Sequence, residues 1–129
     1  MATKISVKNL DNDPNYEPVL PQWFGITDET TDTKSGTLLR VQIPPKTESS
    51  FHYHTNGDLI FFIISGSCVF EVGEGEEKSE YTLDAEDFFY SPRGEVHKVY
   101  NSSETQACEA VAGYFGCSNP YKSGKIIVK

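Results

Sequence analysis

Long apolar runs and a basic surface are both missing from this chain of 129 residues. The longest apolar run, residues 59–64, is far shorter than the roughly 20 residues that a membrane-spanning helix needs. Acidic residues outnumber basic residues by 19 to 11, and the formal net charge is −8. Nucleic acids and anionic membrane surfaces both require a basic footprint. We therefore expect no nucleic acid and no membrane among the partners.

Cysteine and histidine are scarce, with three residues of each. Cys68, Cys108 and Cys117 form neither a CxxC pair nor a disulfide ladder. Residues 1–6 lack an apolar signal core, which argues against secretion. Free thiols are typical of a reducing compartment, so we expect a cytoplasmic protein.

Two segments of different character make up what we expect to be a single domain. Residues 1–35 are polar and interrupted by prolines, which predicts a largely irregular N-terminal arm with short strands that packs on the rest. Residues 36–129 contain short apolar segments separated by turn residues and no helical period, which predicts an all-β barrel or sandwich. The expected strands are 36–43, 51–54, 59–64, 68–72, 78–83, 88–91, 96–101 and 108–114, with a further edge strand at 125–128.

The segment 59–64 is apolar on both of its faces. A strand that is buried on both sides reads as a continuous apolar run. One face is therefore expected to meet the second sheet or a partner subunit, and a homodimer is compatible with this pattern.

All three histidines lie in two of the expected strands. His52 and His54 form an HxH pair on one face of a strand, because the side-chain period of a strand is two. His97 lies in the alternating segment 96–101. Neutral imidazole is a good ligand for iron, zinc, nickel, copper or manganese. Three imidazoles can therefore occupy one face of a divalent metal and leave other positions open.

The residues around these histidines resemble the two motifs of the cupin superfamily. The first motif is G, five residues, HxH, three or four residues, E, six residues, G; here it reads Lys46, His52, His54, Leu59 and Gly66. The second motif is G, five residues, PxG, two residues, H, three residues, N; here it reads Glu86, Pro92, Gly94, His97 and Asn101. The resemblance covers about residues 38–113. It implies an all-β double-stranded β-helix, or jelly-roll, barrel with a metal held by His52, His54 and His97.

Three positions depart from the cupin pattern. Lys46 and Glu86 replace turn glycines, which predicts altered turn geometry. Leu59 replaces the usual glutamate ligand. Asp58 can take over that role only if the register slips by one residue, and such a slip turns a side chain to the opposite face of its strand. A three-histidine site is therefore favoured over a site that recruits Asp58.

A metal held by three neutral ligands keeps its full double positive charge. Such a centre favours a small anionic substrate and leaves a position for dioxygen. We expect Fe(II), while Zn, Ni, Mn and Cu also bind imidazole. The residues expected around the substrate are Leu59, Phe61, Val99, Arg40, Phe89, Tyr114 and Trp23.

The resemblance implies a small-molecule substrate and favours a non-haem Fe(II) dioxygenase, an oxidoreductase that acts on a small organic anion. A metal-dependent isomerase, lyase or cyclase is the second choice. A cupin that binds a small molecule without catalysis is the alternative outside the enzymes.

Overall fold

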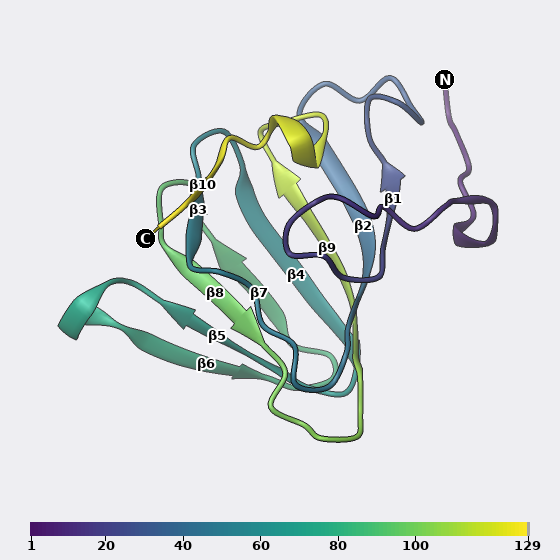
Figure 1. The fold of residues 1–129 in the computed structure, drawn as a ribbon. Helices are drawn as coiled ribbons and strands as arrows, with labels where there is room; N and C mark the ends of the chain where they lie inside the picture. The colour runs from purple at the N-terminus through teal and green to yellow at the C-terminus, as the bar shows by residue number, and fades with distance from the viewer. Residues whose placement is uncertain (129) are drawn as a thin grey trace.

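The computed structural model describes residues 1–128 as two antiparallel β-sheets that pack against each other (Figure 1). We call them the β9 sheet, with strand order β1-β2-β9-β4-β7, and the β3 sheet, with strand order β10-β3-β8-β5-β6. The expected all-β architecture is confirmed. The strands are β1 (Gln22–Ile26), β2 (Gly36–Ile43), β3 (His52–His54), β4 (Asp58–Ser65), β5 (Cys68–Val72), β6 (Ser79–Leu83), β7 (Phe88–Ser91), β8 (His97–Tyr100), β9 (Cys108–Phe115) and β10 (Lys125–Ile127), with 3-10 turns η1 (Val7–Asn9), η2 (Gly75–Glu77) and η3 (Pro120–Lys122).

Alternation of side chains builds the core between the two sheets. In β2, residues Leu39, Val41 and Ile43 are buried, and in β4 the same holds for Leu59, Phe61 and Ile63. Strand β9 lies between these two strands and contributes small inward residues. A Cβ atom at Gly113 of β9 would lie 2.1 Å from the Thr37 carbonyl oxygen, so only glycine fits this close pairing.

Aromatic side chains join the two sheets. The Phe70 ring of β5 lies 5.1 Å from the Phe61 ring in an edge-on contact, and it stacks on the Phe89 ring at 4.3 Å. Aromatic pairs of this kind contribute about 0.5–1.5 kcal/mol beyond the area that they bury. The β3 sheet is therefore held firmly against the β9 sheet close to its histidines.

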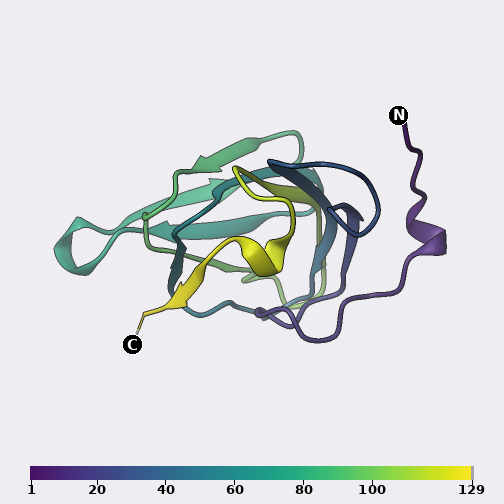
Figure 2. The same ribbon diagram turned by 90° about the horizontal axis from the view of Figure 1, so that it is seen from above.

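The N-terminal arm is tied to the barrel by a strand and by side chains. Strand β1 pairs with β2, so the expected boundary between residues 35 and 36 falls between two strands of one sheet. The buried Gln22 amide donates to the carbonyl oxygens of Tyr16 and Pro18, and Glu17 forms an ion pair with Lys125 of β10. In Figure 2, the C-terminal segment with η3 crosses the end of the barrel that faces the viewer, beside this part of the arm.

Four turn positions of the two sequence motifs share one backbone conformation. Gly66 and Gly94 have φ angles of 74° and 84°, and Lys46 and Glu86 have φ angles of 59° and 73°. The left-handed region suits glycine and costs roughly 1–2 kcal/mol for a residue with a Cβ atom. The altered turn geometry expected at Lys46 and Glu86 is therefore not found. Both residues adopt the glycine-like conformation, and their amides donate to the carbonyl oxygens of Ser103 and Ile63.

An apolar patch covers the outer side of the β9 sheet near β4 and β7. Ile60 and Phe62 of β4 point away from the core, beside the exposed side chains of Phe88, Tyr90 and Phe115. We call these five residues the outer patch. Both faces of the segment 59–64 are thus apolar, and its inner face meets the second sheet as expected.

Helical structure in residues 1–128 consists of short turns. None of these helices has the length and apolar character required to cross a membrane.

Candidate metal centre

Strand pairing brings the three histidines together. His52 of β3 lies directly opposite His97 of β8 in an antiparallel pair, and His54 lies two residues further along the same face of β3. All three side chains are buried, and their potential ligand atoms lie within 4.8 Å of one another. Among residues 1–128, they form the only cluster of three or more His, Cys, Asp or Glu side chains with such spacing. The residues predicted as ligands are therefore close enough to share one ion.

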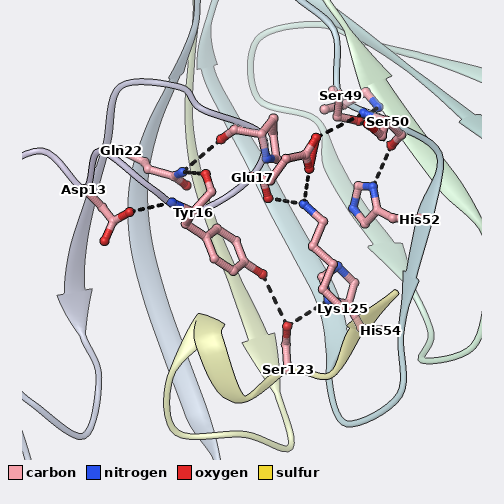
Figure 3. Close-up of polar contacts among 12 residues, drawn as sticks. Asp13, Tyr16, Glu17, Gln22, Ser49, Ser50, His52, His54, Ser123 and Lys125 are labelled. Carbon is pink, nitrogen blue, oxygen red and sulfur yellow. Dashed lines mark hydrogen bonds and ion pairs between the residues drawn. The ribbon is translucent and has the colours of Figure 1, made fainter. Parts of the chain in front are cut away.

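The Nδ1 atom of each ring has a hydrogen-bond partner. The Nδ1 atoms of His52 and His97 lie 2.7 Å and 3.2 Å from the carbonyl oxygens of Ser50 and Glu95. A carbonyl oxygen only accepts, so each of these Nδ1 atoms carries the hydrogen and leaves the lone pair on Nε2. The His54 Nδ1 atom lies 2.9 Å from Ser123 Oγ (Figure 3). Such partners fix the tautomer and the orientation of metal-binding histidines.

One nitrogen of this cluster is fully buried and has no hydrogen-bond partner in the described part of the chain. It is His54 Nε2, which is buried on a side chain that is only 1% exposed. A buried polar atom without a partner costs about 1–3 kcal/mol. A metal ion that accepts the lone pair of Nε2 removes this cost. The three imidazoles therefore fit a divalent first-row metal, because imidazole is a suitable donor and His54 Nε2 has no hydrogen-bond partner.

Burial keeps the imidazoles neutral, as metal binding requires. Removal from water lowers the pKa of His52 to about 4, and the positive charge of Lys125 contributes in the same direction. Burial together with the neighbouring histidines lowers the pKa of His54 to about 2. For His97, burial and then His52 lower the pKa to about 3. At neutral pH, all three rings offer lone pairs.

The position of the usual cupin glutamate carries no ligand. Leu59 is buried and lines a cavity beside the histidines. Asp58 precedes it in β4 and accepts two hydrogen bonds of 3.1 Å from the Arg93 guanidinium and one of 2.9 Å from the Arg93 amide. This guanidinium lowers the pKa of the Asp58 carboxyl. Asp58 is thus committed to Arg93 and does not join the histidine cluster, because alternation along β4 directs it away.

The cavity beside the histidines has a volume of about 50 Å³. It holds a few water-sized groups, since one water needs at least about 10–15 Å³ by this measure. Four of the seven residues expected around the substrate line it, namely Leu59, Phe61, Val99 and Tyr114. The other lining residues are His52, His97, Tyr16, Pro18, Leu20, Gln22, Val41, Phe70 and Ala112.

The other three expected pocket residues lie elsewhere. Arg40 lies on the outer side of β2, where it forms an ion pair of 2.7 Å with Glu109, and it borders an outer hollow together with Trp23. Alternation along β2 explains this position, since the flanking Leu39 and Val41 point inward. Phe89 lies behind the cavity wall and supports it by stacking on Phe70. Contrary to expectation, Arg40, Trp23 and Phe89 therefore do not line the cavity.

The polar residues that support the histidines were not identified from the sequence. Ser50 and Ser123 hold the rings of His52 and His54, and Tyr16 reaches Ser123 from the N-terminal arm (Figure 3). Ser123 lies 69 residues from His54 along the chain. No spacing rule links positions so far apart. Their role follows only from the folded chain.

Comparison with known proteins places this geometry in context. The model of the family described as the cupin domain matches residues 39–114. No curated protein matches. An uncharacterized conserved protein with a double-stranded β-helix domain from Klebsiella pneumoniae is similar in structure, with a TM-score of 0.71, 20% identity, and coverage of 100% of this chain and 99% of that chain. The double-stranded β-helix fold expected from the sequence is thereby confirmed.

Two metabolic enzymes share the fold at low identity. Oxalate decarboxylase from Bacillus subtilis has a TM-score of 0.79 and 14% identity over 98% of this chain and 32% of its own. Oxalate oxidase in complex with glycolate has a TM-score of 0.73 and 18% identity over 95% of this chain and 62% of its own. This chain thus spans about a third of the first enzyme and less than two thirds of the second.

Proposed function

Because the chain belongs to the cupin family, we propose that it is a metal-dependent enzyme, a non-haem Fe(II) dioxygenase acting on a small organic anion. The observation that carries this proposal is the buried three-histidine cluster, in which each Nδ1 is engaged and His54 Nε2 has no other partner in the described chain. Fe(II), when bound, supplies open positions at which an anion and dioxygen meet.

Charge and size favour a small anion as substrate. The three ligands are neutral, so nothing in the cluster offsets the double positive charge of the metal. The cavity of about 50 Å³ admits a molecule of only a few heavy atoms while the arm lies across it. Its apolar residues exclude water, which strengthens the attraction between the metal and an anion. A small carboxylate, enolate or thiolate satisfies both conditions.

A second candidate is lyase chemistry on a small carboxylate. The names of two structural neighbours, oxalate oxidase and oxalate decarboxylase, point to this substrate class, and Mn(II) centres are named for the decarboxylase. Isomerase activity, cyclase activity and binding without catalysis are the other alternative functions. Zn, Ni, Mn and Cu are the alternative metals, because imidazole accepts them all.

Metal analysis followed by a substrate screen tests the proposal. Anaerobically purified protein is expected to contain about one iron per chain, and it should consume dioxygen with one member of a panel of small carboxylates, diketones, thiols and phenolic acids. Carbon dioxide release without dioxygen consumption would replace the dioxygenase by the lyase. Tight binding without turnover would leave a binding protein, and protein that takes up no divalent metal would exclude all the metal-dependent alternatives.

We also propose that two copies associate through the outer patch. Phe88 is 80% exposed, and Tyr90 and Phe115 are each more than half exposed. Apolar residues that gather on one surface are typical of interaction sites. Sedimentation analysis should give a mass close to twice 14.4 kDa, and a Phe88→Asp variant should sediment as a monomer. A monomeric wild type at micromolar concentration would exclude this dimer.

A cytoplasmic location completes the proposal. Cys68, Cys108 and Cys117 are all free and buried in the described chain, as is usual in a reducing compartment. Fractionation of cells that express the protein at its natural level tests this location.

A further inference from the structure

Four polar groups form a continuous chain that begins at one of the histidines. His54 Nδ1 lies 2.9 Å from Ser123 Oγ, Ser123 Oγ lies 3.2 Å from the Tyr16 hydroxyl, and that hydroxyl lies 3.0 Å from the Tyr114 hydroxyl. Figure 3 shows the first two links, which join β3, the C-terminal segment and the N-terminal arm. No other side-chain partner of the two hydroxyls occurs within residues 1–128. This chain of hydrogen bonds therefore ends at Tyr114.

When a metal is bound, this chain of hydrogen bonds contains one hydrogen more than it has contacts. A histidine that ligates through Nε2 carries its hydrogen on Nδ1. His54, Ser123, Tyr16 and Tyr114 then contribute four hydrogens, but only three contacts join them. One hydrogen must find its acceptor outside the chain.

Burial determines which group holds the extra hydrogen. Ser123 is completely buried, and a hydroxyl hydrogen without an acceptor there would carry the full desolvation cost. Tyr114 lies at the end of the chain and lines the cavity. The favoured order is donation from His54 to Ser123, from Ser123 to Tyr16 and from Tyr16 to Tyr114, with the Tyr114 hydrogen left for the cavity.

Other donors near the cavity are already engaged. The Gln22 amide nitrogen donates to the carbonyl oxygens of Tyr16 and Pro18. The Lys125 ammonium contacts the Glu17 carboxylate at 2.6 Å and also donates to the Glu17 carbonyl oxygen. Lys125 does not line the cavity, so Tyr114 offers the donor that remains for a ligand among the lining residues.

We propose that Tyr114 is a specificity-determining residue whose hydroxyl donates a hydrogen bond to an oxygen of a small carboxylate bound in the cavity, with the direction of donation set by metal binding at His54. This inference rests on the proposed metal site and narrows its substrate class. One carboxylate oxygen faces the metal and the second accepts from Tyr114. The apolar neighbours Leu59, Phe61 and Ala112 limit such a ligand to a few heavy atoms.

In the metal-free protein, the same count of hydrogens gives the opposite direction of donation. Without a metal, the His54 hydrogen can move to Nε2, and Nδ1 then accepts from Ser123. Three hydrogens now match three contacts, and Tyr114 donates to Tyr16 instead of to the cavity. Metal binding thus releases a donor for the ligand at the far end of the chain.

Acetate titrations of protein loaded with Co(II) or Zn(II) test this inference by calorimetry, independently of any turnover. Tyr114→Phe should weaken acetate binding by about tenfold or more, as expected for one hydrogen bond to a charged group. Its metal affinity should stay within about threefold of the wild type, because phenylalanine keeps the ring that packs against His54 at 4.7 Å and removes only the hydroxyl. In the metal-free protein, the wild type and Tyr114→Phe should bind acetate equally weakly.

An exposed tyrosine outside the cavity provides a matched control. Tyr121→Phe removes an exposed hydroxyl that contacts Asp13, so acetate binding should be unchanged. If Tyr114→Phe fails to fold by circular dichroism, site-specific 3-fluorotyrosine at position 114, a stronger donor, should tighten acetate binding.

The outcomes separate the two proposals. A metal-loaded Tyr114→Phe that binds acetate as tightly as the wild type overturns the role of Tyr114 and leaves the metal site standing. An equal loss in Tyr121→Phe and Tyr114→Phe also overturns it, because Tyr121 does not line the cavity. Unchanged affinity with 3-fluorotyrosine has the same consequence. A wild type that binds no divalent metal overturns both proposals.

Discussion

The two sheets of this barrel use their inner faces for different purposes. The β3 sheet carries all three histidines on its inner face, on β3 and β8. The β9 sheet faces them with aliphatic and aromatic residues such as Leu59, Phe61 and Ala112. Its outer side is apolar as well, over the outer patch. One sheet thus supplies the polar chemistry, and the other supplies the apolar wall that keeps water away from it.

This division explains why a buried polar cluster is tolerated. The histidines are neutral. The Nδ1 atoms of His52 and His97 contact the carbonyl oxygens of Ser50 and Glu95, just before β3 and β8, and the Nδ1 atom of His54 contacts Ser123 in the C-terminal segment. The β9 sheet contributes packing and few polar contacts. Ser91 Oγ of β7 lies 3.5 Å from His97 Nδ1, and Tyr114 joins the hydrogen-bond chain at its far end. Changes in the two sheets should therefore affect different properties, and the following predictions separate them.

The largest effect is expected for the histidines themselves. His54→Ala, or the same change at His52 or His97, should weaken metal binding by about a thousandfold or more, since loss of a supporting residue alone typically costs 10–100-fold. Tyr53→Phe is the matched control, because Tyr53 points to the other face of β3. Metal affinity measured by competition with a chelating dye checks both. Similar losses from the two kinds of change would show that the ligands are assigned wrongly.

Packing of the β9 sheet should appear in stability. Ile63 is completely buried, so Ile63→Ala should lower the free energy of unfolding by about 2–5 kcal/mol. The next residue, Ile64, is 44% exposed on the opposite face, and Ile64→Ala should cost less than about 1 kcal/mol. Urea unfolding of the metal-free proteins gives both values. Equal costs would mean that the two faces of β4 are not distinguished as the structure shows.

The β3 sheet should make the metal-free protein sensitive to acid. Unfolded histidine binds a proton near pH 6.5, whereas burial lowers the pKa values in the folded protein to about 4, 2 and 3 for His52, His54 and His97. Between pH 6.5 and about 4 the unfolded state binds more protons, so the free energy of unfolding falls as the pH falls. Each histidine contributes up to about 1.4 kcal/mol per pH unit. Urea unfolding at several pH values measures the slope.

A histidine variant sharpens this test. His97→Gln removes one of the three groups, so the slope of stability against pH should be smaller than in the wild type. A slope that is unchanged in His97→Gln would assign the acid sensitivity to other groups.

The smallest effect is expected at a turn outside both inner faces. Glu86 has a φ angle of 73°, which is strained for a residue with a Cβ atom. Glu86→Gly should raise the free energy of unfolding by up to about 1 kcal/mol, because relief of the strain exceeds the added flexibility of the unfolded chain. Thermal unfolding monitored by circular dichroism is the measurement. A lower melting temperature would contradict the strained conformation.

Much of the fold follows from local patterns. Short apolar segments between turn residues predicted β2, β4, β5 and β9 close to their observed bounds, because strands that border the core must carry apolar residues. The side-chain period of two placed His52 and His54 on one face. It did not place Arg40, since alternation tells that two residues share a face but not which face looks inward.

What the sequence determined by itself is the list of candidate ligands and the β-strands that carry them, because side-chain period and motif spacing are local properties. Only the tertiary structure decided that Asp58 serves Arg93, that Trp23 and Arg40 lie outside the cavity, and that Ser123 and Tyr16 join His54 to Tyr114. These contacts join residues far apart in the chain, and their geometry is set by how the sheets, the arm and the C-terminal segment pack.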